Sequence, residues 1–156
     1  MIEDWVDTLV EVWRIDIGDF KQVKSPYIFK EQKFPDAISP ADDFPIALTF
    51  LSNIRPIYSK GYKSITWYGQ TEFHITPDLK KSHNPALMLW PGRILRAAAL
   101  EVQLGGLVGN FTILDQSDGI DGPVALKYGD EAEHWGFIVN WMVEESLNGT
   151  QLPVSG

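Results

Sequence analysis

Apolar and polar positions follow two periods along this chain, one typical of helices and one typical of strands. Residues 2–14 carry an apolar stripe at helical spacing with acidic residues on the other side, which predicts an amphipathic helix. The stripe consists of Ile2, Trp5, Val6, Leu9, Val10 and Trp13. Residues 86–104 also keep helical spacing, and Pro91 suits a first helical turn. The main part of a second helix is therefore expected to start near Pro91 and to end at Gly105-Gly106.

Strand periodicity is clearest in residues 64–76 and 135–144. In the first segment, one face is mostly apolar and the other consists of Thr66, Tyr68, Gln70, Glu72, His74 and Thr76. Residues 44–51 form an apolar run of the length of a buried strand, and residues 107–114 and 124–128 predict shorter strands. The order of helix, strands, helix and strands favours an α+β fold. We expect a mostly antiparallel mixed sheet, with the N-terminal helix and the second helix packed on one face.

The expected organisation is a single domain over residues 1–145. Residues 20–43 contain three prolines and alternate loosely between lysines and large apolar residues, so we interpret them as a long loop or arm. Its aromatic residues Tyr27, Phe29 and Phe34 are candidate anchors on a partner. Residues 146–156 are expected to form a flexible C-terminal tail.

Composition and charge narrow the class of protein. A chain of 156 residues with 44% apolar residues can bury a core without disulfides or metals. It contains no cysteine, which excludes both disulfides and thiolate metal sites. The net charge of −8 argues against general or sequence-specific nucleic-acid binding, because phosphate neutralisation needs clustered Lys and Arg. No apolar run has the length of a membrane span, and the acidic N-terminus lacks the pattern of an export signal. We therefore expect an intracellular protein with no membrane partner.

No pattern of residues predicts catalysis or a cofactor. The three histidines are 9 and 51 residues apart, which matches no short metal motif, although His74 and His134 would approach each other if their strands paired. The acidic residues near the C-terminus are expected to stay ionised in solvent, which gives no proton donor for a hydrolase. They are Asp130, Glu131, Glu133, Glu144 and Glu145. No serine lies in a nucleophile elbow. The sequence thus predicts no enzyme, no catalytic or metal site and no cofactor.

The arrangement as a whole resembles a known family. An amphipathic helix is followed by the segments FPIALTF (44–50) and WYGQTEFHI (67–75), an Ala-rich helix closed by Leu104-Gly105-Gly106, and YGDEAEHWG (128–136). This order is similar to that of the tail terminator, or tail completion, proteins of long-tailed bacterial viruses and related tail-like assemblies. The resemblance implies a structural virion protein that forms a homo-oligomeric ring, a hexamer in that family. Such a ring caps the tail tube and joins the tail to the head–tail connector.

The resemblance also implies partners and a location. The partners would be other copies of the chain, the tail tube protein and the connector proteins, at the head-proximal end of a tail assembled in the host cytoplasm. Candidate interface residues are Tyr27, Phe29, Phe34, Tyr68, Gln70, Glu72, His74, Asp130, Glu131, Glu133 and His134. The acidic turn at residues 130–134 is expected to meet lysines of a neighbouring copy. The alternative is a small-ligand-binding α+β domain whose pocket is lined by Trp67, Trp90, Trp135 and Trp141.

Overall fold

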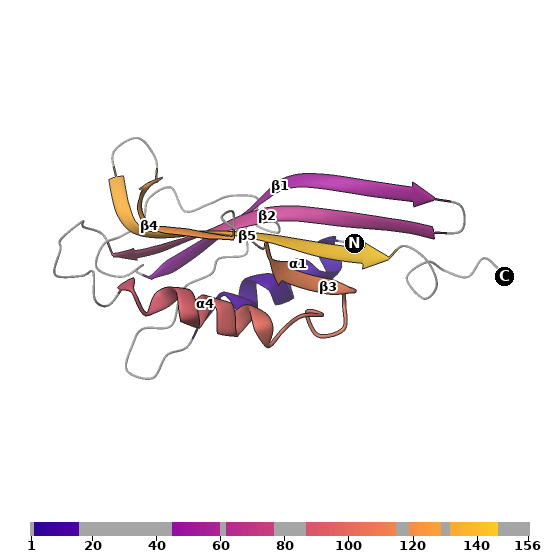
Figure 1. Cartoon of the computed structure of the whole chain (residues 1–156), viewed down its shortest axis with the longest axis horizontal. Helices are drawn as coiled ribbons and strands as arrows, with labels where there is room; N and C mark the ends of the chain where they lie inside the picture. The colour runs from indigo at the N-terminus through magenta and orange to yellow at the C-terminus, as the bar shows by residue number, and fades with distance from the viewer. Residues whose placement is uncertain are drawn as a thin grey trace.

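The computed structural model describes residues 2–15, 45–59, 62–76, 87–114, 119–128 and 132–146. In chain order the elements are α1 (Ile2–Val12), β1 (Ile46–Ser59), β2 (Tyr62–Thr76), α4 (Trp90–Ala99), β3 (Asn110–Ile113), β4 (Ile120–Tyr128) and β5 (Ala132–Ser146). This confirms the predicted α+β class, with an N-terminal helix, a second helix and a five-stranded sheet (Figure 1). The predicted arm at residues 20–43 and residues 147–156 of the predicted tail lie outside the described residues. Neither described helix is long and apolar enough to cross a membrane.

The sheet is built around β5. Its order is β1-β2-β5, and the far edge of β5 is shared by two strands: β4 pairs with its first half and β3 with its second half. Every pairing among the described strands is antiparallel. The long β1–β2 hairpin forms one edge of the sheet, and β3 and β4 form the other. One edge is therefore a single long strand, β1, whereas the other edge consists of two shorter strands, β4 and β3.

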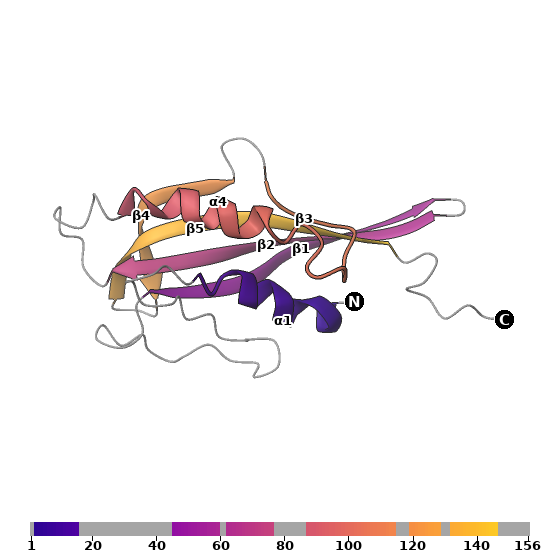
Figure 2. The same ribbon diagram turned by 90° about the horizontal axis from the view of Figure 1, so that it is seen from below.

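Both helices pack on the same face of the sheet. The β2–β5 register pairs the odd-numbered residues 65–73 of β2 with the odd-numbered residues 137–145 of β5 on that face, and the apolar side chains among them form the core with α1 and α4. Figure 2 looks onto this face and shows α1 lying along the β1 side of the sheet and α4 lying over β5, on the side of β3 and β4. The alternation in residues 64–76 and 135–144 predicted which side chains face the helices, because a strand buried on one face needs apolar side chains at every second position.

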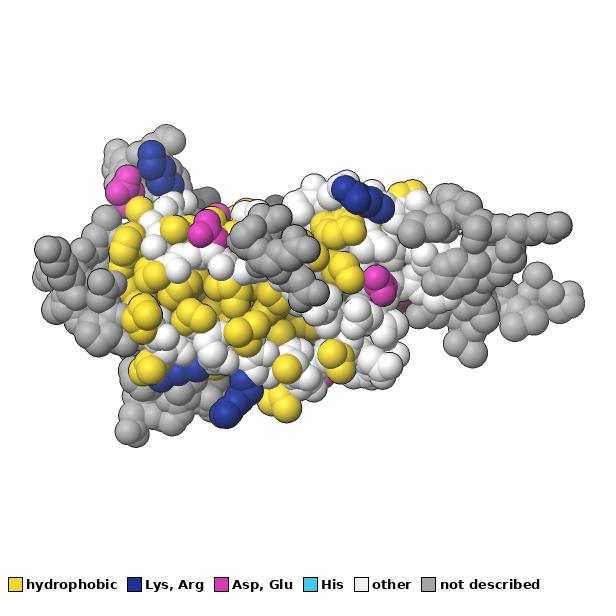
Figure 3. Space-filling view, in the orientation of Figure 1, with side chains coloured by type: hydrophobic (Ala, Val, Ile, Leu, Met, Phe, Trp, Pro, Cys, Tyr) yellow, Lys and Arg dark blue, Asp and Glu magenta, His cyan; other side chains and the backbone are white. Residues whose placement is uncertain are grey.

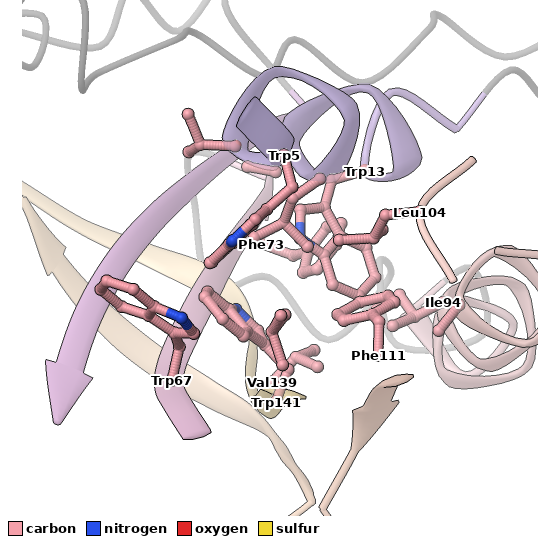
Figure 4. Packing of buried hydrophobic residues seen from close by; sticks show 14 of the residues in the cluster. Trp5, Trp13, Trp67, Phe73, Ile94, Leu104, Phe111, Val139 and Trp141 are labelled. Carbon is pink, nitrogen blue, oxygen red and sulfur yellow. The ribbon is translucent and has the colours of Figure 1, made fainter. Parts of the chain in front are cut away.

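Tryptophan rings fill the space between α1 and the sheet (Figure 4). Trp5 meets Trp67 and Trp141 edge-on, with ring centroids 5.8 and 6.3 Å apart, and Trp13 meets Phe73 in the same way at 5.4 Å. Gly69 makes this packing possible. A Cβ atom at that position would collide with the Trp141 ring, which lies over the backbone of β2.

Several element boundaries differ from the prediction. β1 continues past residue 51 to Ser59, because a bulge between Leu51 and Asn53 keeps it paired with β2. α4 begins at Trp90 with proline in its first turn, as predicted, but it ends at Ala99. Residues 100–107 form hydrogen-bonded turns, in which Leu104 is fully buried at a positive φ of 47°. β3 is shorter than predicted and β4 longer.

Candidate functional site

The predicted interface residues of β2 lie on the sheet face that points away from the helices. Tyr68, Gln70 and Glu72 are half-buried there, because they alternate with the core residues of the same strand. His74 shares this face, but its side chain is completely buried. The chain itself therefore encloses the His74 ring, while the three residues before it remain partly accessible.

The predicted acidic turn is only partly covered by the described residues. Glu133 is exposed at the start of β5, as expected for a surface acid, whereas the neighbouring His134 is buried. Five further candidates lie outside the described residues: Tyr27, Phe29, Phe34, Asp130 and Glu131. The structure thus distinguishes Glu133, which is exposed, from His134, which is buried on the sheet face that points away from the helices.

The structure brings His74 and His134 together, as the pairing of their strands required. Their Nδ1 atoms are 2.8 Å apart, and the two rings meet edge-on with centroids 5.0 Å apart. On its other side, His74 Nε2 lies 3.2 Å from Glu72 Oε2. The three side chains form a polar cluster that runs from the buried His134 ring to a partly exposed carboxylate.

The geometry of this cluster limits how many protons it can hold. Two Nδ1 atoms at hydrogen-bond distance need one proton and one lone pair between them, so the two rings cannot both be imidazolium ions. One arrangement that satisfies both contacts has His134 Nδ1–H donating to His74 Nδ1, and His74 Nε2–H donating to Glu72 Oε2. Burial, and then the nearby His74 ring, lower the pKa of His134 below its ordinary value of 6.5. The cluster therefore favours a neutral His134.

The histidine pair is not accompanied by a cluster of metal-ligating side chains in the described part of the chain. No group of three or more His, Cys, Asp or Glu side chains within this part is arranged to hold a metal ion. His74 and His134 instead use their Nδ1 atoms on each other, which is a structural hydrogen bond.

Sequence reasoning missed the most deeply buried acid in the described part of the chain. Glu145 is 2% exposed, and its Oε1 atom accepts hydrogen bonds from the indole Nε1 atoms of Trp5 at 2.8 Å and Trp67 at 2.9 Å. The expectation that all the C-terminal acids lie in solvent is wrong for this residue. Charge-assisted bonds of this kind compensate for taking a carboxylate out of water. Glu145 thus ties α1 to both β2 and β5.

A signal for this position was present in the sequence. Glu145 continues the inward phase of Trp141 and Val143, two residues apart each time, and it lies opposite Ile65 in the ladder. Ending the strand at Glu144 hid that phase. Glu144 itself is exposed on the opposite face, as expected.

The four tryptophans proposed to line a ligand pocket belong to the hydrophobic core or pack against it. Trp67, Trp90 and Trp141 are each at most 5% exposed, and Trp135 packs partly buried against the same cluster. A groove of about 320 Å³ does occur, between α4 and β3, and its lining is mostly aliphatic. It is lined by Leu95, Ala98, Ala99, Val102, Phe111, Thr112 and Ile113.

Exposed apolar side chains continue from this groove over the neighbouring surface. Among the described residues, six of the eight exposed large hydrophobic side chains lie between residues 88 and 107. They are Met88, Leu89, Leu95, Leu100, Val102 and Leu107. Figure 3 shows hydrophobic side chains gathered on the face that carries α4, with basic side chains along its lower border. Contiguous apolar surface of this kind marks interaction sites. A scan against protein-family models finds no match to this chain, and a search of curated proteins finds no significant match.

Proposed function

We propose that this protein is a structural subunit of a homo-oligomeric ring, with a role like that of the tail terminator proteins that its order of elements resembles. The observation that carries the proposal is the apolar surface on residues 88–107, where six large hydrophobic side chains are exposed. Leaving such side chains in water is unfavourable by about 25 cal/mol for each Å². A protein partner that covers them recovers this free energy.

The described polar clusters suit a structural role. The Glu145 carboxylate is bonded to two tryptophans of the core, and the His74–His134 pair is enclosed by the chain. Both clusters hold elements in place, and of their side chains Glu72, at the end of the histidine cluster, is the one that is partly exposed. The resemblance supplies the rest of the proposal: the ring caps the tail tube at its head-proximal end and contacts the tube and connector proteins.

Native mass spectrometry across a range of concentrations tests the ring. We expect a monomer of 17.6 kDa at low concentration and a closed assembly, of six copies by the resemblance, at high concentration or on tail tubes. Immunogold labelling of tails from the organism that encodes the chain tests the location. Label at one end of each tail is expected. A monomer at the highest soluble concentration together with unlabelled tails would contradict the proposal.

A further inference from the structure

The exposed large hydrophobic side chains form two groups on different elements. The first group covers α4 and the turns after it; we call this surface, with the groove against β3, the α4 flank (residues 88–107 and 111–113). The second group consists of Leu51 and Ile54 on β1, which are 42% and 45% exposed. Both side chains lie on the helix side of the sheet, because Leu51 pairs with Gly69 and Ile54 with Trp67.

The α4 flank combines apolar and basic character. α4 buries Trp90, Ile94 and Ala98 against the sheet, and the next position, Leu95, is half exposed beside the groove. Arg93 lies over the Trp90 ring at 5.4 Å, and Arg96 is exposed on the same helix. Segment 87–107 contains two bases, Arg93 and Arg96, and one acid, Glu101. Its net charge is therefore +1, whereas the whole chain has a net charge of −8.

The opposite flank combines apolar and acidic character. We call it the α1 flank; it consists of α1 and the edge strand β1. β1 contributes one base, Arg55, which lies over the Tyr68 ring. The outer side of α1 exposes Asp4, Asp7 and Glu11, and the described segment 2–15 carries four acids and one base, a net charge of −3, so α1 and β1 together carry −2. The base, Arg14, is already paired with Glu11 at 3.0 Å. Leu51 and Ile54 supply the apolar part of this flank.

These two surfaces lie at opposite sides of the molecule. β1 is one edge of the sheet and β3 is the other, and α4 contacts β3. Figure 2 shows the same separation, with α4 along one side, α1 along the other and the strands between them. Two different, mutually complementary surfaces at opposite sides of a subunit produce head-to-tail contacts, which close into a ring when the rotation between copies allows it.

We propose that the α4 flank of one copy binds the α1 flank of the next copy. The second copy is the occupant that matches the observations, because the same chain carries an apolar surface with basic borders and an apolar surface with acidic borders. The apolar parts provide affinity, and the opposite charges fix orientation and disfavour contacts between like flanks. This inference rests on the proposed ring function and identifies the interface that builds it.

Cysteine cross-linking tests the contact, because the natural chain contains no cysteine. Leu95→Cys marks the α4 flank and Ile54→Cys marks the α1 flank; both side chains are about half exposed, so the fold should tolerate the change. With a short bis-maleimide, neither single variant should cross-link to itself. An equimolar mixture should give only a 1:1 dimer. The double variant should give a ladder in steps of 17.6 kDa that stops at the closed ring.

A matched control is Glu144→Cys combined with Ile54→Cys, since Glu144 is exposed on the other face of the sheet. Dimers of Leu95→Cys alone would show that α4 flanks pair with each other and would overturn the inference. A double variant that cross-links no better than the control would overturn it as well. The two proposals fail separately. If the double variant gives a cross-linked ladder but immunogold labels no tails, only the role in the tail is contradicted. If native mass spectra show rings but the double variant gives no ladder, only this interface is contradicted.

Discussion

Replacing Glu145 tests whether a buried carboxylate holds α1 on the sheet. Its Oε1 atom accepts two indole hydrogen bonds, and all three side chains are at most 5% exposed. In Glu145→Leu the acceptor disappears while the Trp5 and Trp67 donors stay buried. Glu145→Gln keeps a carbonyl oxygen for the same donors, removes the charge and replaces the second carboxylate oxygen with an NH2 group.

The expected magnitude follows from the number of donors. A buried donor without a partner destabilises the fold by about 1–3 kcal/mol, so two donors give about 2–6 kcal/mol for Glu145→Leu. For a chain of this size, 1 kcal/mol lowers Tm by about 2–4 °C. A mid-range loss of about 4 kcal/mol therefore lowers Tm by about 8–16 °C. Glu145→Gln should lose less than half as much, because a neutral bond is about half as strong as a charged one.

Urea unfolding followed by tryptophan fluorescence measures these differences, and the adjacent exposed acid provides the control. Glu144→Leu should change the free energy of unfolding by no more than about 0.5 kcal/mol. Combining Glu145→Leu with Trp67→Phe should cost less than the sum of the single changes, since the second change removes one of the unpaired donors. If Glu145→Leu is as stable as the natural chain, the carboxylate does not stabilise the contact between α1 and the sheet.

Three further predictions concern pH, packing and assembly. Because the pKa of folded His134 is lowered, its contribution to stability is complete above the unfolded value of 6.5 and is lost as pH falls through the folded value. Tm should therefore fall from pH 7.5 to pH 5.5, and less steeply in His134→Asn; equal slopes would refute this. Gly69→Ala should destabilise by about 1–3 kcal/mol through collision with Trp141, while Gly92→Ala, with open space in α4, should stabilise by up to about 1 kcal/mol in the same denaturant assay. Combined Asp130→Lys and Glu131→Lys should leave Tm nearly unchanged and weaken ring assembly in native mass spectra, and unaffected assembly would count against a contact there.

The long strands were predictable from the sequence because each has one buried face. In β2 and β5 the alternation is strong, and it predicted the two strands and their inward side chains. The second half of β1 was not predictable in this way. Residues 51–56 are all exposed, so no apolar alternation marks them, and Pro56 is tolerated because β1 is an edge strand.

The candidate site was only partly predictable for a similar reason. The sequence indicated that His74 and His134 would approach each other if their strands paired, and they do, but the burial of the two rings depends on every element that surrounds them. The periodicity of one strand does not show which other elements cover its side chains. The end of α4 shows the same limit: residues 100–104 keep helical spacing, yet the chain turns so that Leu104 enters the core.

The two buried polar clusters lie on opposite faces of the same pair of strands, and this placement bears on the proposed interface. Glu145 reaches the helix side of β5, whereas His74 and His134 meet on the other side. A slip of one residue between β2 and β5 would move every side chain to the wrong face. It would separate Glu145 from Trp67 and break the histidine contact, leaving buried polar atoms unpaired. The clusters therefore penalise any register but the observed one. Because β1 is built on β2 and β3 on β5, the same register sets the relative position of the α1 flank and the α4 flank. The proposed ring closes only when that relation is the same in every copy, so we expect the buried polar contacts to serve its geometry as well as the stability of the subunit.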